Sequence, residues 1–100
     1  MIVINGRITT KDGQVERLRR AIADLERATR GEPGCLDYVF AVEVNDPNSV
    51  RLVERWESAD ALRAHFGTPH MAAFQAAMQS DPPAGMELKV YEAKEISLPR

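Results

Sequence analysis

The sequence predicts a single α+β domain of the ferredoxin-like type, with the element order β-α-β-β-α-β. Three observations lead to this prediction. Four segments alternate apolar and polar side chains or are rich in β-branched residues, as strands are. Between them lie segments that repeat apolar residues every three or four positions, as amphipathic helices do. The chain has 100 residues and no internal repeat, low-complexity segment or linker, so we expect one domain over residues 1–100.

The first predicted strand runs from about Ile2 to Thr9, and its side chains alternate between two faces. Ile4 points to one face, whereas Asn5 and Arg7 point to the other. Asp12 then offers a side-chain cap for a helix of about five turns. The apolar stripe of this helix consists of Val15, Leu18, Ile22, Leu25 and Ala28. Its end is marked by Gly31, Pro33 and Gly34.

The next two strands are predicted from their aromatic and β-branched residues. The second strand spans Cys35 to Val44 and places Leu36, Tyr38, Phe40 and Val42 on one face. Asn45 to Asn48 carry strong turn chemistry. The third strand follows from Val50 to Glu57, with one face formed by Val50, Leu52, Glu54 and Trp56.

The second helical region is expected to be split in two. Ser58 caps a short helix that carries Ala61, Leu62, His65 and Phe66, and Gly67 ends it. Thr68 and Pro69 then restart a helix, because Thr is a favoured cap and Pro suits the first helical position. Its apolar stripe is Met71, Phe74 and Met78. Residues 81–85 break the chain before a final strand from Met86 to Ile96.

The second strand carries apolar side chains on both faces, with Val39 and Ala41 opposite Tyr38 and Phe40. Helices cover only one face of a sheet of this type, so the other face must pack against something else. The sheet of a second copy is the simplest partner. We therefore expect a homodimer.

Composition excludes several classes of protein. The 13 basic and 15 acidic residues give a net charge of −2 without any block of like charge, so neither nucleic acid nor an anionic membrane is an expected partner. No apolar run is long enough to span a bilayer. The first ten residues lack the pattern of a secretory signal. With Cys35 as the only cysteine, no intrachain disulfide or thiolate zinc site can form, and the cytoplasm is the expected location.

Three segments resemble the antibiotic biosynthesis monooxygenase family, in particular its quinol monooxygenase branch. Glu32 to Tyr38 (EPGCLDY) is similar to the family's E-x-G-C-x-x-Y motif, which leads into the second strand. Val53 to Ser58 (VERWES) is similar to its E-x-W-E-S motif. Ala64 to Met71 (AHFGTPHM) is similar to its A-H-x-x-T-P-H-M motif. The three occur in the family's order and spacing, and the resemblance covers nearly the whole chain.

The resemblance implies a homodimer in which two sheets face each other as a barrel, with a ligand cavity in each subunit between sheet and helices. Characterised members oxygenate quinols or polyketide-derived phenols, some of them without metal, flavin or haem. In that chemistry an electron-rich aromatic anion passes an electron directly to O₂. The protein's task is then to deprotonate the phenol, exclude water and hold the ring. We therefore expect a monooxygenase that uses no cofactor.

Trp56, His70 and His65 are the candidate catalytic residues. The Trp56 ring can stack on a flat substrate, and its N–H can polarise a bound oxygen atom; the alternative is a large core residue. Either histidine can accept a phenolic proton, because imidazole is the natural base near neutral pH. The alternatives are local backbone contacts for His70 and packing for His65. No third ligand lies at a recognisable metal-site spacing, so no metal is expected.

Five residues are expected to contact the substrate. They are Tyr38, Asn5, Phe66, Met71 and Phe74. Tyr38 can donate a hydrogen bond, although a tyrosine of the core with a satisfied hydroxyl is the alternative. Met71 and Phe74 suit an adaptable aromatic pocket, and their alternative is ordinary helical core. Cys35 has no basic neighbour in the sequence, so it is interpreted as a small packed residue rather than a nucleophile.

Two positions differ from better-understood relatives. Haem-degrading members carry asparagine where this chain has Gly6; Asn5 lies one residue earlier and faces the other way, which disfavours haem degradation. Cofactor-free polyketide oxygenases carry asparagine four residues before the tryptophan, where this chain has Leu52. Two other functions stay open. One is an isomerase of a small phosphorylated sugar or signalling ketone, and the other is a non-catalytic dimer that binds an aromatic metabolite.

Overall fold

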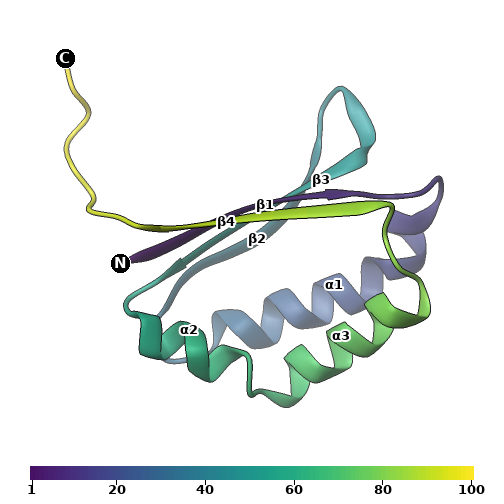
Figure 1. Ribbon diagram of the computed structural model, residues 1–100, viewed down its shortest axis with the longest axis horizontal. Coiled ribbons are helices and arrows are strands. Elements are labelled where there is room, and N and C mark those ends of the chain that lie inside the picture. Colours follow the sequence, from purple (N-terminus) through teal and green to yellow (C-terminus); the bar gives the residue numbers. More distant parts are fainter.

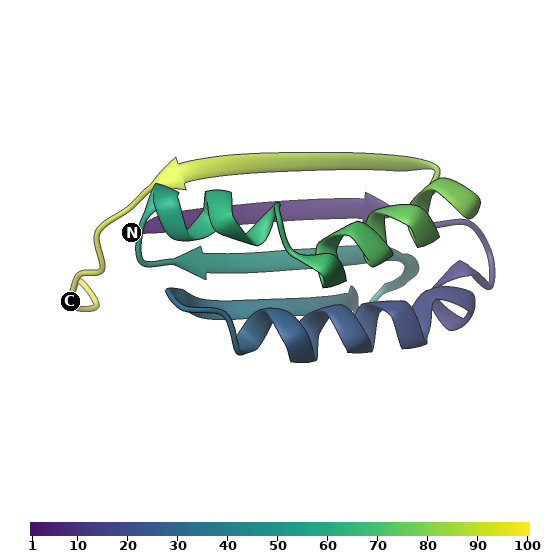
Figure 2. The ribbon, with the colours of Figure 1, turned by 90° about the horizontal axis from the view of Figure 1, so that it is seen from below.

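The computed structural model describes residues 1–100 as a four-stranded antiparallel sheet with three helices on one of its faces (Figures 1 and 2). The strands are β1 (Ile2–Thr9), β2 (Cys35–Glu43), β3 (Asp46–Trp56) and β4 (Gly85–Glu92). The helices are α1 (Gln14–Arg30), α2 (Ala59–His65) and α3 (Pro69–Ser80). The strand order is β2-β3-β1-β4, so the predicted ferredoxin-like fold with a divided second helix is confirmed.

The register of the sheet sets which side chains meet on the face that the helices cover. Tyr38 pairs with Glu54, and Glu54 pairs with Ile4, so these three residues form one row across β2, β3 and β1. The next row joins Phe40, Leu52, Gly6 and Leu88. Because side chains alternate along a strand, both rows point toward the helices.

The core lies between α1 and the β2–β3 half of the sheet. Its central cluster is formed by Leu25, Tyr38, Leu52 and Trp56, all of them buried. The end of the α1 stripe differs from the prediction, because Ala28 is exposed and Thr29 is buried in its place. In the last turn of α1, Thr29 therefore faces the sheet in the place predicted for Ala28.

The predicted cap of α1 by Asp12 is wrong. The N-cap position is occupied by Gly13, whose φ of 74° is a left-handed conformation that glycine adopts without strain. The Asp12 carboxylate instead accepts a hydrogen bond from the Asn48 side chain at 2.7 Å. The Gln14 side chain accepts from the Lys11 backbone N–H and donates to the Asp81 carbonyl, so it joins the start of α1 to the end of α3.

Two strand boundaries differ from the prediction by more than one residue. The third strand begins at Asp46 rather than Val50, because Asp46 already pairs with Glu43 across a hairpin whose ladder is irregular at that point. The last strand ends at Glu92 rather than Ile96. Glu92 pairs with Ile2, one further pair of hydrogen bonds joins Ala93 to Met1, and residues 94–96 pair with no strand.

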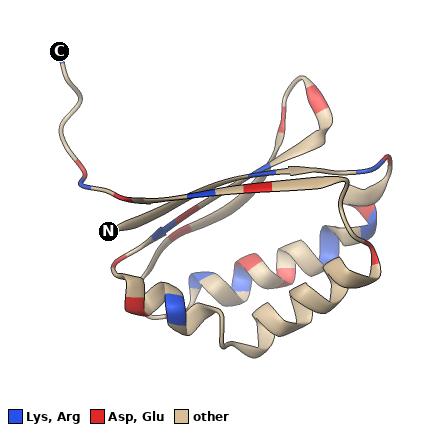
Figure 3. Cartoon of the chain, viewed as in Figure 1, with Lys and Arg blue, Asp and Glu red and all other residues tan.

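The predicted caps of α2 and α3 are confirmed. The Ser58 hydroxyl accepts from the Ala61 N–H at 3.1 Å, and the Thr68 hydroxyl accepts from the Met71 N–H at 3.3 Å. Figure 3 shows that α3 carries no charged side chain, and none of its residues is fully buried. It therefore lies over the sheet without filling the space beneath it. None of the helices has the length and apolar composition needed to cross a bilayer.

Replacing a core leucine tests this packing. Leu25 is almost completely buried in the core, so we expect Leu25→Ala to lower the free energy of unfolding by about 2–5 kcal/mol. The matched control is Leu98→Ala in the exposed tail beyond β4, for which we expect a change below about 0.5 kcal/mol. Urea unfolding followed by Trp56 fluorescence measures both. Equal effects of the two substitutions would contradict the position of the core.

Candidate active site

A cavity of about 660 Å³ lies between the sheet and α3. All four strands and the α3 region contribute to its wall, which is mostly apolar. The lining residues are Ile4, Ile8, Tyr38, Phe40, Leu52, Glu54, Phe66, Met71, Phe74, Gln75, Met78, Gln79, Pro82, Pro83, Met86 and Leu88. The size and apolar character are those of a small-molecule site.

Glu54 is the one charged side chain in the wall of this cavity. It is buried on β3 between Tyr38 and Ile4, and no lysine or arginine faces it from the lining. Burial raises the pKa of Glu54 above its ordinary value; the hydrogen bond from Trp56 and the proximity of His65 oppose this effect. A carboxyl group in such a place is a better proton acceptor than an exposed one.

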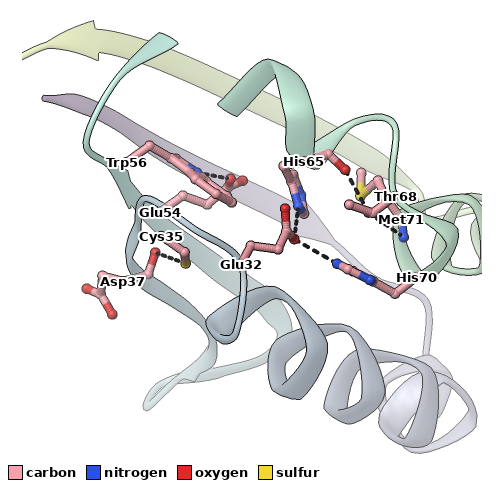
Figure 4. Close-up of polar contacts among 9 residues, drawn as sticks. All are labelled: Glu32, Cys35, Asp37, Glu54, Trp56, His65, Thr68, His70 and Met71. Atoms are coloured by element: carbon pink, nitrogen blue, oxygen red, sulfur yellow. Dashed lines mark hydrogen bonds and ion pairs between the residues drawn. The ribbon is translucent and has the colours of Figure 1, made fainter. Parts of the chain in front are cut away.

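Trp56 lies behind the cavity rather than in its wall. The side chain is 0% exposed, and its Nε1–H donates to Glu54 Oε1 at 2.9 Å (Figure 4). Its ring packs edge-on against Tyr38, with ring centroids 6.5 Å apart. In this chain, Trp56 therefore holds the Glu54 carboxylate in place instead of presenting its face to a ligand.

His65 and His70 are brought together by Glu32, which the sequence marked only as the start of a motif and not as a site residue. Glu32 Oε2 lies 2.7 Å from His65 Nδ1 and 2.7 Å from His70 Nε2 (Figure 4). His65 is 1% exposed, whereas His70 is 24% exposed. Neither histidine is part of the cavity wall, although their neighbours Phe66 and Met71 are.

The second nitrogen of His65 has no protein partner. Nε2 is buried and makes no hydrogen bond, while the ring packs 4.9 Å from the Trp56 ring and 5.4 Å from the Tyr38 ring, measured between centroids. A buried polar atom without a partner carries a free-energy cost, and such atoms occur often at functional positions. His65 thus links the Glu32 cluster to Trp56 behind the cavity and to Tyr38 in its wall.

Local structure explains why Glu32 reaches the two histidines. The loop between α1 and β2 turns at Gly34, whose φ is 82°. A Cβ at Gly34 would lie only 2.6 Å from the Ala61 Cβ, so glycine allows the loop to approach α2 closely. The Thr68 hydroxyl donates to the His65 carbonyl at 2.7 Å, which joins α2 to the start of α3 and His70.

Four of the five predicted substrate contacts line the cavity. They are Tyr38, Phe66, Met71 and Phe74. Asn5 is exposed on the opposite face of β1, so it does not contact the cavity of its own chain, contrary to the sequence-based assignment. Gly6 does point toward the cavity side, where an added Cβ would lie 2.7 Å from a Leu88 methyl and 3.1 Å from the Leu52 Cβ.

Burial also affects the two other ionisable groups near the cluster. It raises the pKa of the Tyr38 hydroxyl, with a further contribution from the Glu54 charge, so Tyr38 stays a hydrogen-bond donor at neutral pH. Burial and the charge of Glu32 raise the pKa of the Cys35 thiol as well. Cys35 is therefore a packed thiol, as the sequence predicted, and not an activated nucleophile.

This chain matches one family model and is similar in sequence to known bacterial proteins. A family model described as antibiotic biosynthesis monooxygenase matches residues 1–77. The probable quinol monooxygenase YgiN of Escherichia coli is 31% identical over 91 residues, which are 81% of this chain and 88% of YgiN. An uncharacterized protein of Synechocystis sp. is 30% identical over 94 residues, which are 94% of this chain; the match spans 64% of that protein's length.

Solved structures show the same fold. A Deinococcus radiodurans protein given the same family description superposes with a TM-score of 0.89 at 23% identity, covering 100% of this chain and 99% of that one. A Mycobacterium tuberculosis protein superposes with a TM-score of 0.84 at 22% identity, covering 97% and 98%. At these identities the likeness concerns the fold.

The burial of Glu54 predicts a pH-dependent contribution to stability. Because the pKa of Glu54 in the folded chain is raised above 4.5, the folded state binds this proton more tightly than the unfolded state. The contribution is fully present below pH 4.5 and is lost as the pH rises through the raised pKa. We expect the free energy of unfolding of Glu54→Gln, relative to the original protein, to increase over this range. The increase is about 1.4 kcal/mol for each tenfold difference in proton affinity between the folded and unfolded states.

Glu16→Gln is the matched control for this measurement. Glu16 is exposed on α1, and its hydrogen bond with Arg19 lowers its pKa, so any effect has the opposite sign. Urea unfolding at a series of pH values measures both variants. If the difference between Glu54→Gln and the original protein did not vary with pH, the raised pKa would be disproved.

Proposed function

This chain belongs to the antibiotic biosynthesis monooxygenase family, and we propose that it is a monooxygenase that oxidises a quinol or similar electron-rich phenol with O₂ in the cavity beneath α3. The observation that carries the proposal is the buried Glu54 carboxylate in the wall of an otherwise apolar cavity. Family membership agrees with the three sequence motifs, all of which begin within the matched residues 1–77.

The lining of the cavity supports an uncharged aromatic substrate. Phe40, Phe66 and Phe74 offer ring contacts, and Met71 and Met78 offer flexible apolar contacts. The lining contains no lysine or arginine to hold a phosphate group. This observation favours a neutral quinol over the phosphorylated substrate of the isomerase alternative.

Glu54 is the proposed proton acceptor. His70 and His65 were the bases expected from the sequence, but Glu54 lines the cavity and neither histidine does. The hydrogen bond from Trp56 fixes one carboxylate oxygen, which leaves the other free to accept the phenolic proton. Trp56 is therefore a positioning residue in this proposal, and the Tyr38 hydroxyl is available to donate to the second oxygen of the substrate.

The reaction balances with the quinol and O₂ alone. Loss of the phenolic proton to Glu54 makes the ring electron-rich enough to pass electrons to O₂. One oxygen atom of O₂ replaces a ring hydrogen, the ring is oxidised to a hydroxyquinone, and the other oxygen atom leaves as water. The substrate supplies all four electrons, so the proposed reaction requires no separate reductant or resident cofactor. The apolar wall keeps water from competing for the intermediate.

A homodimer built through the uncovered face of the sheet is part of the proposal. That face carries Val3, Val39, Val53 and Tyr91, which no helix covers, together with a set of charged side chains. Arg51 pairs with Glu43 and Arg55 with Asp37 on this face, so its charges are largely compensated within the chain. An apolar strip with compensated charges supports packing against a second copy.

The activity is tested by oxygen consumption. We expect metal-free protein to accelerate O₂ uptake with at least one member of a panel of benzo- and naphthoquinols, above the spontaneous rate. Replacing the proposed base, in Glu54→Gln, lowers kcat/KM by about 10²–10⁴-fold, because a general base contributes about that much. The conservative change keeps an oxygen that can accept from Trp56, so the fold is maintained.

Glu16→Gln again serves as the control, since it removes the same charge from an exposed position. A Glu54→Gln variant with unchanged kcat/KM would contradict the assigned base. No turnover of any quinol by the original protein, combined with saturable binding of the same quinols, would establish the non-catalytic binding alternative instead.

The dimer is tested by light scattering. Each chain has a mass of 11.2 kDa, and we expect a particle of twice that mass at micromolar concentration. Val53→Asp places an unpaired charge at the centre of the proposed interface and shifts the particle to the monomer mass. Circular dichroism checks that the variant stays folded. A monomeric original protein would contradict the proposed interface.

A further inference from the structure

Three metal-ligating side chains converge at one point beside the cavity. Glu32 comes from the loop after α1, His65 from the last turn of α2, and His70 from the first turn of α3 (Figure 4). Their ligand atoms all lie within 4.8 Å of one another. No metal site was expected from the sequence, because the two histidines had no third ligand at a recognisable spacing. The fold supplies that ligand from 33 residues earlier in the chain.

We propose that Glu32, His65 and His70 bind a divalent transition-metal ion of the Zn²⁺ type. Two imidazoles and one carboxylate are a common protein ligand set for Zn²⁺, with water in the fourth position. The same donors also bind Co²⁺ and Fe²⁺. This site is distinct from the oxidation proposed above, because none of its three ligands belongs to the cavity wall.

An ion at this point requires the three ligand atoms, which now lie within 4.8 Å of one another, to rearrange. Ligand atoms about 2.1 Å from a tetrahedral metal lie about 3.4 Å apart. Both nitrogens now lie 2.7 Å from the same Glu32 oxygen, so each contact lengthens by somewhat more than half an ångström when an ion enters. His70 is the most exposed of the three side chains and has the freedom to make this movement.

Burial and charge favour an ion at this point. The Glu32 side chain is 11% exposed, so its negative charge acts in a medium of low dielectric constant and attracts a cation more strongly than a surface carboxylate does. No lysine or arginine side chain pairs with Glu32; its ionic partners are the two histidines. A divalent ion would compensate this charge while retaining both imidazoles as neutral ligands.

Metal binding also changes which ring nitrogen of His65 carries the proton. In the absence of an ion, Nδ1 donates to Glu32 when the ring is neutral, and the buried Nε2 is left without a proton. A metal on Nδ1 requires the proton to lie on Nε2. Nε2 then becomes a donor beside two rings: Trp56, which lies behind the cavity, and Tyr38, which lines it.

The experiment is a titration of untagged, chelator-treated protein with Co²⁺, whose visible absorption reports its coordination, followed by displacement with Zn²⁺. We expect saturable binding of one ion per chain. Glu32→Gln and His70→Ala each weaken binding by at least about 100-fold, because even changes outside the ligand set cost 10–100-fold. These two variants avoid His65, whose complete burial makes a folding defect a risk.

Glu57→Gln is the matched control, since Glu57 is an exposed acid near the same loop that offers no ligand to the cluster. Zn²⁺ at about a hundredfold excess over its Kd also raises Tm by roughly 10 °C in the original protein and in Glu57→Gln, but not in Glu32→Gln. Absence of saturable Co²⁺ binding, or equal binding by Glu32→Gln and the original protein, would overturn the proposal.

The Co²⁺ titration and the oxygen-uptake assay test the two proposals independently. Glu54→Gln removes the proposed base but none of the three ligands, so we expect it to keep saturable binding of one Co²⁺ ion per chain, with a loss of affinity far smaller than that of Glu32→Gln. Oxygen uptake is measured without metal. Metal binding without quinol oxidation, or oxidation without metal binding, therefore identifies which of the two proposals fails.

Discussion

The rest of the site depends on a carboxylate that is buried without a cation beside it. Glu54 stands on β3 where strand alternation turns every second side chain toward the core, between Leu52 and Trp56. A charge in that position has a large desolvation cost, which the single N–H of Trp56 offsets only in part. The pKa of Glu54 is raised because the desolvation cost exceeds the stabilisation that the Trp56 hydrogen bond provides. A protein that only needed a stable core would gain from an apolar residue there.

The cavity exists because α3 does not fill the space that Glu54 faces. α3 has no fully buried residue and no charged one, so it packs beside α1 and leaves its methionines and phenylalanine as the cavity wall. The break between α2 and α3 has a second effect. Thr68 caps α3 and holds the His65 carbonyl, and this fixed junction places His65 and His70 on either side of Glu32. The wall and the histidine cluster are therefore products of the same chain break.

The sequence predicted the fold well because local signals and strand alternation agree with each other. β1, the split second helix and the caps at Ser58 and Thr68 follow from residues close together in the chain. Boundaries failed where distant pairing decides, as at Asp46 and Glu92. Glu54 had a visible signal, an acid on an apolar strand face, although its importance appears only when burial and the Trp56 contact are known. Glu32 had a motif but no local reason to meet the two histidines, because their approach depends on a loop turning at Gly34 against α2.

The charge of Glu32 acts on the Glu54 carboxyl group. Burial is the main cause of the raised pKa of Glu54; the charge of His65 lowers this pKa and that of Glu32 raises it further. The base in the cavity therefore responds to the charge of the cluster behind it. A cation held by Glu32, His65 and His70 would cancel the negative charge of Glu32 and add positive charge near Glu54. Glu54 would then keep its negative charge at a lower pH and become a weaker proton acceptor. Because such coupling is reciprocal, a proton on Glu54 would in turn weaken cation binding at the cluster. An ion at the cluster and the oxidation chemistry in the cavity are thus connected by charge, even though they share no ligand.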